Sequence, residues 1–352
     1  MTRKRITQKD VAAYAGVSTG TVSRAINDHP WVSAEAKEQV RKAILELGYV
    51  ADFSARSLAK GRTNNVMFLL LNEETILPTT WSYELPIIQG ALDHFKDAGM
   101  HLQILMHSVE EARAPGFFPE LISNRPIDAI VVLSAWSLEE HSISELRRIN
   151  VPHVFIGNGP YPTTHEGGAG EGCVIFDNSG VIVDVVERLC ELGHGLIAFI
   201  KGSAGQAHAD LRYEAFRRVL KERQLQIPED FVIDGDYSVQ AGYEGLHRLW
   251  KLDPKPTAVV CANDYMAIGV MKAALELGLH VPGDISVVGF DDADVSAYLP
   301  VPLSTVRVPL LEIGSRAAKR VHELLTLGST TPADTLASEY VERASVGAAA
   351  PG

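Results

Sequence analysis

The chain has 352 residues, of which 46% are apolar and 22% are charged, so it can bury more than one sizeable core. The three cysteines, Cys173, Cys190 and Cys261, have no paired spacing, and this excludes a disulfide framework or a zinc site of the usual spacing. The basic residues at the start precede no apolar segment, and no run approaches the length of a membrane span, so we expect a cytoplasmic protein.

The charge is distributed unevenly along the chain. Lys and Arg number 32 and Asp and Glu 44 in the whole sequence; 11 and 6 of these lie at or before Arg62, which leaves 21 and 38 for the remainder. The first 62 residues therefore carry +5 and the others −17. Because neutralisation of phosphates by Lys and Arg supplies most non-specific affinity for nucleic acid, we expect DNA contact at the amino-terminal end.

Two short helices joined by a glycine turn are expected at the amino-terminal end. Thr7 is a candidate N-cap, with Asp10 three residues later as a short capping box. Gly16 supplies a tight turn, and Ser18 caps a second helix over residues 19–27. Two helices that cross over such a turn form the helix-turn-helix arrangement, which places the second helix in the major groove of DNA.

A third helix, which Ser33 opens and Gly48 closes, covers the first two with an apolar face. A short linker follows, and residues 66–71 then form an apolar run typical of a buried strand. The alternative at this point is that the three helices only pack together and contact no DNA.

Beyond the linker, apolar runs alternate with amphipathic stretches. This alternation predicts an α/β body of parallel sheets with helices on both faces, and ligands of such sheets bind beyond the carboxyl ends of the strands. The expected strands are 66–71, 102–106, 129–133, 153–156, 196–200, 258–261 and 285–290, and the expected helices are 87–98, 181–191, 209–223, 239–250, 265–276 and 310–327.

The motifs of the chain, in their order, resemble the lac repressor/galactose repressor family of bacterial transcription regulators over nearly the whole length. In the head and hinge the matching motifs are Asp10-Val11-Ala12, Ala15-Gly16-Val17-Ser18, Thr21-Val22-Ser23-Arg24, Val32-Ser33, Leu47-Gly48-Tyr49 and Ala55-Arg56-Ser57-Leu58. In the body they are Leu192-Gly193-His194, Ala262-Asn263-Asp264, Val287-Val288-Gly289-Phe290-Asp291-Asp292 and Leu303-Ser304-Thr305-Val306.

The resemblance implies two domains. Residues 1–62 would form an all-α helix-turn-helix head with a hinge helix at about 53–60, and residues 63–352 a bilobed domain that binds an effector and dimerises. The body would be built like periplasmic sugar-binding proteins, and the chain would cross between its two parallel-sheet lobes three times. We expect lobe one at 63–160 and 296–326, lobe two at 161–292 and 327–352, and the crossings near 157–170, 292–297 and 327–332.

The first residues of the second helix are the candidates for base contact. Arg24 can present its guanidinium to guanine, a contact worth about 1–3 kcal/mol of discrimination, and Thr19 can offer its methyl group to thymine. Gly20 lies on the same face as Arg24. In the resembling family this position usually carries a side chain that contacts bases, so we expect one reading position without a side chain.

Short polar side chains of the head are candidates for phosphate contacts, which position a protein on DNA without reading its sequence. They are Thr7, Ser18, Thr21, Ser23, Asn27 and Ser33. Helix capping or solvation is the alternative for each of them, and for Ser33 we favour capping as the primary role.

The resemblance also places a minor-groove contact in the hinge. Leu58 occupies the position of a leucine that wedges between bases at the operator centre, and Ala55 and Arg56 share its short helix. A helix of about seven residues is not stable alone in water, so we expect it to form only with DNA and a partner hinge beside it. Packing of Leu58 against its own body is the alternative.

The residues that match positions of effector contact in the family are Trp81, Tyr83, Arg212, Tyr237, Asn263 and Asp291. Charged and amide groups bind hydroxyls while aromatic rings cover an apolar ring face, so this set suits a sugar. A nucleobase is less favoured, because the purine-binding branch resembles one with Arg where this chain has Gln206. Core packing is the alternative for the two aromatic residues of the first lobe, and a structural ion pair for Arg212 and Asp291.

Enzyme motifs are weak in this sequence. The glycine-rich stretch 167–172 lacks the spacing of a dinucleotide-binding loop, and no phosphate loop, nucleophile elbow or helical His pair is present, so we expect no catalysis, cofactor or metal. Scattered histidines are expected as surface or capping groups, and they are His94, His101, His107, His165, His194 and His208.

We therefore expect a ligand-responsive repressor of carbohydrate-metabolism genes that binds a pseudo-palindromic operator as a homodimer. The chain ends without the leucine-heptad helix through which some relatives form tetramers, which favours the dimer. The alternatives that the sequence leaves open are a nucleobase, a nucleoside or another metabolite as the effector, and a stand-alone sugar-binding protein.

Overall fold

The computed structural model describes residues 6–26, 29–49, 62–72, 81–123, 125–134, 138–157, 170–329 and 335–350. The chain divides into two compact units, Met1–Thr63 and Asn64–Gly352. Asn27 and the hinge residues Ala55, Arg56 and Leu58 lie outside the described residues, as does the side chain of Trp81. Within the described ranges, no helix combines the length and the apolar character that crossing a bilayer requires.

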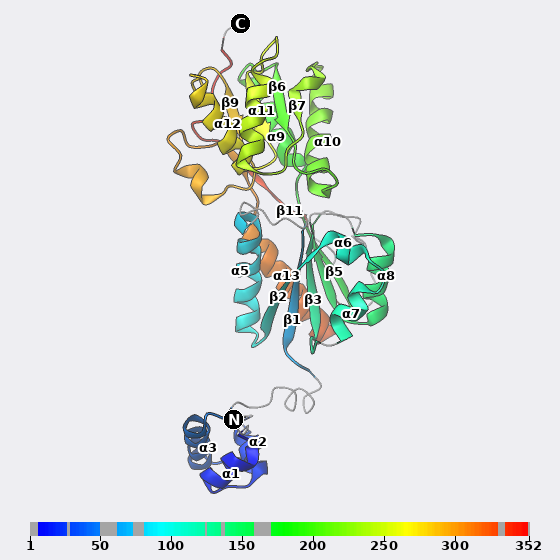
Figure 1. Cartoon of the computed structure of the whole chain (residues 1–352), viewed down its shortest axis with the longest axis vertical. Helices are drawn as coiled ribbons and strands as arrows, with labels where there is room; N and C mark the ends of the chain where they lie inside the picture. Colours follow the sequence, from blue (N-terminus) through cyan, green and yellow to red (C-terminus); the bar gives the residue numbers. More distant parts are fainter. Residues whose placement is uncertain are drawn as a thin grey trace, which may run out of the picture. The chain divides into compact units, whose positions relative to one another are not determined.

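The described part of the first unit contains three helices (Figure 1), and they are α1 (Gln8–Ala15), α2 (Thr19–Ile26) and α3 (Ala34–Leu47). Thr7 and Asp10 form the expected capping box at the start of α1, and the Ser33 hydroxyl caps α3. Gly16 and Gly48 end α1 and α3 in the left-handed conformation, with φ 65° and 61°, which favours glycine at both positions. The local cap signals therefore confirm the three expected helices.

The core of the head is small and draws on all three helices. Val11 of α1, Val22 of α2, and Val40 and Ala43 of α3 are buried together. Helices as short as α1 and α2 are not stable alone in water, so this shared core supplies the stability that each of them lacks.

Lobe one of the second unit is built on a six-stranded parallel sheet (Figure 1). In spatial order its strands are β11 (Thr335–Leu336), β5 (Glu171–Phe176), β4 (His153–Ile156), β3 (Ala129–Ser134), β1 (Asn65–Asn72) and β2 (His101–Ser108). The helices on one face are α5 (Trp81–Asp97) and α13 (Leu310–Leu327), and those on the other are α6 (Val109–Arg113), α7 (Phe117–Ser123) and α8 (Glu140–Ile149). The expected layered α/β arrangement is confirmed.

Strand β1 shows why a strand in the middle of this sheet is apolar at every position from Val66 to Leu71. Phe68 and Leu70 pack into the cluster formed with α5 and α13, whereas Met67 and Leu69 pack into the cluster formed with α7 and α8. Successive side chains of a strand point to opposite faces, so a strand covered on both faces must be apolar throughout.

Lobe two contains a second parallel sheet of four strands. In spatial order they are β7 (Val232–Ile233), β6 (Ile197–Ile200), β8 (Ala258–Cys261) and β9 (Ser286–Val288). Its helices are α9 (Gly180–Glu191) and α10 (Ala207–Glu222) on one face, and α11 (Val239–Leu249) and α12 (Asp264–Glu276) on the other. The carboxyl ends of these strands place the loops that build the candidate site.

Three segments connect the lobes, and each lies further along the chain than expected. The first crossing follows β5 at Asp177, since Glu171–Phe176 pairs in parallel with β4 of the first sheet. The second runs through β10 (Thr305–Arg307), beyond the short helix η3 (Asp294–Ala297). The third lies between β11, which pairs with β5, and β12 (Glu339–Val341), which pairs antiparallel with β10.

The division of the body thus differs from the expected one at two strands. We expected lobe two to include 161–292 and 327–352, but the pairing places β5 and β11 in the sheet of lobe one. The physical reason is that both strands are short, and their own apolar pattern carries no information about which sheet they join. Pairing with β4 and β5 is a long-range interaction that fixes this choice.

Candidate functional site

The exposed face of α2 presents the candidate base-reading residues, from Thr19 in its first turn to Arg24 in its last turn. Thr19 and Arg24 are exposed, and the Thr21 N–H donates to the Ser18 hydroxyl at 3.0 Å, which fixes the start of the helix. A Cβ on Gly20 would lie 3.7 Å from Arg24 Nη2, an ordinary contact distance, so the guanidinium lies beside the bare glycine. The guanidinium of Arg24 and the methyl group of Thr19, both exposed on one short helix, suit the edges of bases in a groove.

Three of the candidate phosphate contacts act as helix caps. Thr7 Oγ1 donates to Asp10 Oδ2 at 2.6 Å, and the hydroxyls of Ser18 and Thr21 lie 2.9 Å apart in a shared hydrogen bond. The Ser33 hydroxyl accepts a backbone N–H at 3.2 Å. The capping alternative is therefore correct for Thr7, Ser18 and Ser33, and a phosphate contact by these residues stays a prediction.

The turn between α2 and α3 holds an aromatic residue that the sequence analysis did not single out. Trp31 is 86% exposed, and its ring lies edge-on to that of His29 with centroids 5.3 Å apart. Ser23, another phosphate candidate, is half-buried on α2. This residue could have been recognised from the sequence, because a tryptophan directly after Pro30 lies in the connection between two expected helices and not on their apolar faces.

In the second unit, Arg212 of α10 joins the carboxyl ends of three strands. Its side chain is buried, with Nε donating to Asn178 Oδ1 at 2.8 Å and Nη1 to the Ala262 carbonyl at 2.6 Å. Nη2 lies 3.7 Å from Asp291 Oδ1, and the guanidinium stacks over the Phe290 ring at 3.5 Å. Arg212 thus forms the structural ion pair that was the alternative, at the edge where parallel sheets bind ligands.

Tyr237 follows β7 and is positioned by two neighbours. Asn263 is the N-cap of α12: its Oδ1 accepts the Met266 N–H at 2.9 Å, and its Nδ2 donates to the Tyr237 carbonyl at 3.0 Å. A Cβ on Gly202 would overlap the Tyr237 ring and hydroxyl, so the ring occupies space that only glycine leaves open. Asn263 therefore holds Tyr237 in place as well as starting a helix.

Aromatic rings from both lobes meet at the same place. Tyr83 of α5, in lobe one, has its ring centroid 6.2 Å from that of His208 of α10, in lobe two, and His208 is equally 6.2 Å from Tyr237. Burial, and to a smaller extent the charge of Arg212, lowers the pKa of His208 to about 3, so its ring is neutral near pH 7. Three neighbouring aromatic rings, one from lobe one and two from lobe two, therefore meet around His208.

Two of the six histidines expected as surface or capping groups are buried, and the expectation is wrong for them. His208 is 9% exposed in the first turn of α10, where that turn faces lobe one. His194 bonds to the Thr257 hydroxyl at 2.9 Å and to the Gly347 carbonyl at 3.0 Å. Across the described part of the chain, no group of three His, Cys, Asp or Glu side chains is placed to hold a metal ion.

Two buried polar atoms of residues that interact with Arg212, the Tyr237 hydroxyl and Asp291 Oδ1, make no hydrogen bond within the described residues, and neither does Gln206 Oε1, directly before α10. Burial raises the pKa of Asp291 to about 6, with Arg212 opposing the rise, and burial raises the pKa of Tyr237 above its usual range. Buried polar groups are almost always hydrogen-bonded in proteins, so these atoms are the candidates for hydrogen bonds with a ligand. The interlobe site is defined here as Tyr83, Gln206, His208, Arg212, Tyr237 and Asp291.

Sequence analysis missed His208 and used Gln206 only to disfavour a purine. Both residues lie at the start of α10, just beyond the carboxyl end of β6. That position was the available signal, since the loops after parallel strands carry ligand contacts.

Asp264 holds the second crossing segment against lobe two. Its Oδ2 accepts from the Ala293 N–H and the Ser296 hydroxyl, both at 2.7 Å, and its Oδ1 accepts from the Thr305 hydroxyl at 2.5 Å. Burial raises the pKa of Asp264 to about 7, and the bonds from Thr305 and Ser296 limit the rise. One buried carboxyl therefore joins α12 to the segment around η3 and to the first residue of the second crossing.

Asp292 joins the second and third crossings to each other. It accepts from Arg307 Nε of β10 at 2.7 Å and from Arg343 Nη2, just beyond β12, at 2.6 Å. Charge-assisted bonds of this kind are stronger than neutral ones, and here they add to the antiparallel pairing of β10 with β12.

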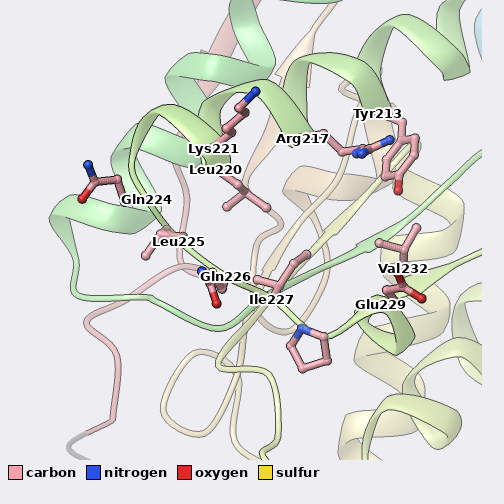
Figure 2. Close-up of a pocket in the computed structure, with 11 residues that line it drawn as sticks. Tyr213, Arg217, Leu220, Lys221, Gln224, Leu225, Gln226, Ile227, Glu229 and Val232 are labelled. Atoms are coloured by element: carbon pink, nitrogen blue, oxygen red, sulfur yellow. The ribbon is translucent and has the colours of Figure 1, made fainter.

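A separate hollow of about 840 Å³ lies between α10 and the segment that follows it (Figure 2). Tyr213, Arg217 and Lys221 of α10 border it, with Ile227 and Glu229 opposite. Arg217 lies 5.8 Å from the Tyr213 ring centroid, and both lysine and arginine are exposed to solvent. None of the sequence-predicted site residues lines this groove, so it is distinct from the interlobe site.

The sequence matches two families. Residues 7–52 match the bacterial regulatory proteins of the lacI family, and residues 186–346 match the periplasmic binding protein-like domain. The HTH-type transcriptional repressor PurR of Haemophilus influenzae is 31% identical over 324 residues, 91% of this chain and 91% of the relative. The ribose operon repressor of Escherichia coli is 31% identical and covers 88% of this chain and 90% of the relative. Both relatives are transcriptional repressors rather than enzymes.

Solved structures share the fold. The lac repressor dimer bound to operator and the anti-inducer ONPF matches with a TM-score of 0.81 at 26% identity, over 98% of this chain and 100% of that chain. The transcriptional regulator CelR in complex with cellobiose matches with a TM-score of 0.67 at 27% identity, over 97% and 100%. The helical head, the parallel-sheet body and these relatives together identify the chain as a member of the lacI family of bacterial regulatory proteins.

Proposed function

We propose that the chain is a repressor whose head binds operator DNA and whose interlobe site binds a sugar-like effector that changes operator affinity. The observation that carries this proposal is the meeting of a guanidinium, a carboxyl group and aromatic rings from both lobes, with three unpaired buried polar atoms among them. The relatives support it, since one is named for a ribose operon and one structural neighbour is a complex with cellobiose.

On the DNA side, Arg24 and Thr19 read bases and Gly20 leaves one position unread. The exposure of Thr19 in the first turn of α2 supports its assignment, because a recognition helix contacts bases with its amino-terminal residues. Arg24 lies in the last turn of α2, and its guanidinium is beside Gly20. Thr21, Ser23 and Asn27 are assigned to phosphate oxygens, as are the capping residues Thr7, Ser18 and Ser33. Ala55, Arg56 and Leu58 of the hinge are assigned to the minor groove on the family resemblance alone.

On the effector side, Asp291 and Tyr237 bond to hydroxyls with the atoms that have no protein partner. Arg212 has Nη2 facing Asp291 at 3.7 Å, beyond hydrogen-bond distance, so a hydroxyl between them can bond to both. Tyr83, with Trp81 in the same helix, covers the apolar face of the sugar ring, and Asn263 holds Tyr237 in position.

The functional form that we propose is a homodimer on a pseudo-palindromic operator. Leu85 and Leu92 are exposed two turns apart on α5, and Leu311 is exposed near the start of α13. In lobe two, Leu275 and Tyr298 are 78% and 85% exposed. Apolar side chains exposed on both lobes favour association with a second copy, and a two-fold dimer matches a two-fold operator.

The experiment that tests the proposal combines two titrations of the full-length protein. Thermal shift against mono- and disaccharides, nucleobases and nucleosides measures effector binding, and fluorescence anisotropy of labelled promoter fragments at several salt concentrations measures DNA binding. We expect a saccharide to raise the Tm and to change operator affinity, and removal of residues 1–62 to abolish only the second effect. A nucleobase with both effects would establish the alternative effector, and no preference for any promoter fragment over random duplex would contradict the repressor.

A further inference from the structure

We infer that the effector is an uncharged polyhydroxyl ring, and that Gln206 and Asp291 select it against anionic sugars such as uronates and sugar phosphates. The inference rests on the proposed function, because it takes the interlobe site as the effector site. It goes further by assigning a charge class to the ligand and a selecting role to two residues.

The unpaired buried atoms of the site indicate what kind of group the ligand must offer. Gln206 Oε1 and Asp291 Oδ1 have no hydrogen-bond partner among the described residues, and both atoms are acceptors. A ligand must therefore donate hydrogens to them. Hydroxyl groups donate, whereas carboxylate and phosphate oxygens that carry charge at neutral pH only accept. A buried acceptor that faces another acceptor is costly, so the site discriminates against an acidic substituent here.

The second argument is the charge of the site. Arg212 is the one cation, in the described part of the chain, that perturbs the pKa of Tyr83, His208, Tyr237 and Asp291. Its Nε and Nη1 are bonded to protein atoms, and Asp291 offsets its charge at 3.7 Å. An anionic ligand would meet the Asp291 carboxyl group without an uncompensated positive charge to balance it.

The sequence shows that the undescribed segments do not supply a further cation to the body. Residues 73–80, 135–137, 158–169 and 330–334 contain neither Lys nor Arg. Lys201, at the end of β6, is paired with Asp234 at 2.6 Å. An anionic effector would therefore have to compete for charges that the protein already neutralises.

The third argument is the state and place of His208. Its side chain makes no hydrogen bond to the part of the chain that the structure describes, and its ring centroid lies 6.2 Å from that of Tyr83 and 6.2 Å from that of Tyr237. Because burial keeps it neutral, it offers one N–H donor and one nitrogen acceptor rather than a positive charge. A neutral imidazole between two phenol rings provides a surface for the apolar face of a sugar ring and one polar contact to a hydroxyl.

The test compares neutral sugars with acids of the same ring. Glucose, galactose, cellobiose and ribose are titrated by calorimetry into full-length protein beside glucuronate, galacturonate, cellobionate and ribose 5-phosphate, with operator anisotropy as a second readout. We expect at least one neutral sugar to bind and to change operator affinity, with its acidic counterpart at least 100-fold weaker. An acid that binds more tightly than its neutral counterpart overturns the inference and leaves the repressor proposal intact.

Variants identify the selecting residues. Gln206→Leu removes an acceptor and should weaken binding of the neutral sugar at least tenfold. Gln226 is exposed beyond α10, so Gln226→Leu should leave the affinity for the sugar unchanged. Asp291→Asn removes the opposing charge and should lower the ratio of neutral to acidic affinity at least tenfold. A purely structural role for Asp291 would weaken both ligands alike, so an unchanged ratio contradicts the charge argument. A panel in which no sugar, neutral or acidic, changes either readout overturns the saccharide effector itself.

Discussion

The head and the interlobe site present their functional groups in opposite ways. Thr19 and Arg24 lie exposed on one short helix, α2, whose start is fixed by the hydroxyl of the preceding Ser18, so all of these residues are close in sequence. Arg212, by contrast, is buried and is bonded to groups from segments that are 34 and 50 residues away. A substitution in the head should therefore change one contact, whereas a substitution in the interlobe site should change the packing of several segments at once.

Arg212→Ala should give the largest effect and would sharpen this comparison. It leaves Asp291 buried without its ion-pair partner, and removing one partner of a buried pair typically costs about 3–5 kcal/mol. We expect the body to unfold at lower urea concentration and effector binding to be lost. Arg217→Ala, on the exposed side of the same helix, is the matched control and should leave both unchanged. Equal stability of the two variants would show that Arg212 is not a structural centre.

The pH dependence of stability should reveal Asp264. Its pKa is 3.8 when unperturbed and about 7 in the folded chain, so between these values the folded protein holds a proton that the unfolded chain releases. The free energy of unfolding contributed by this group is therefore greatest below about pH 4 and decreases as the pH rises towards 7, by up to about 1.4 kcal/mol per pH unit.

Comparison of the wild type with Asp264→Asn in urea at pH 5, 6 and 7 isolates this contribution. Several other groups titrate in the same window. Among them, Asp291, with its pKa raised to about 6, acts in the same direction. His208, whose pKa is lowered to about 3, acts in the opposite direction, because the unfolded chain binds its proton first as the pH falls. We expect the difference between the two proteins to vary with pH, and a constant difference would contradict the raised pKa of Asp264.

Arg24→Ala should test the opposite side of the comparison, where one contact is lost and the packing is kept. Loss of a bidentate base contact should reduce operator discrimination by about 1–3 kcal/mol, while the thermal shift with the effector stays the same. Arg41→Ala is the control, since Arg41 is exposed on α3 and paired with Glu38 at 2.7 Å. Footprinting that shows unchanged specificity in Arg24→Ala would assign base reading to other residues.

Gly202→Ala should weaken effector binding, although no residue that we assign to the effector is replaced. The added Cβ overlaps the Tyr237 ring, which must rotate out of the interlobe site. We expect about a tenfold loss of effector affinity by calorimetry, which corresponds to about 1.4 kcal/mol. Gly195→Ala, where a Cβ meets nothing within 4 Å, should bind normally. Full affinity in Gly202→Ala would place the effector away from Tyr237.

Thr7→Ala should have the smallest effect and one limited to the head. Loss of the N-cap should destabilise α1 by about 1 kcal/mol, because the Asp10 N–H loses its acceptor. Amide hydrogen exchange should be faster in the head and unchanged in the body. Faster exchange in lobe two as well would contradict the independence of the two units.

The same contrast explains which parts of the molecule the sequence could predict. Helix ends in the head depend on neighbours three or four residues away, so Thr7, Gly16, Ser33 and Gly48 were recognised from sequence and confirmed in the structure. Strand β1 was also recognised, since burial on both faces makes it apolar throughout.

Long-range features were not predictable in this way. Short strands such as β5 and β11 carry too little pattern to choose a sheet, and His208 gave no local sign of burial, because lobe one covers it through contacts over 100 residues apart in sequence. Arg212 was placed at the site by family resemblance, but the sequence alone could not distinguish a ligand contact from a structural ion pair. The hydrogen bonds to Asn178 and Ala262 show the structural role.

The two hydrogen bonds that the Asp292 carboxylate accepts limit how the lobes can move. Arg307 and Arg343 bond to it from two different crossings, and β10 and β12 are paired beside it, so these two connections behave as a single strap. With the remaining connection at Asp177, the lobes have two attachment points instead of three. Two points define one axis, so opening and closing of the body should be a rotation with one degree of freedom, and an effector needs only to select an angle about that axis.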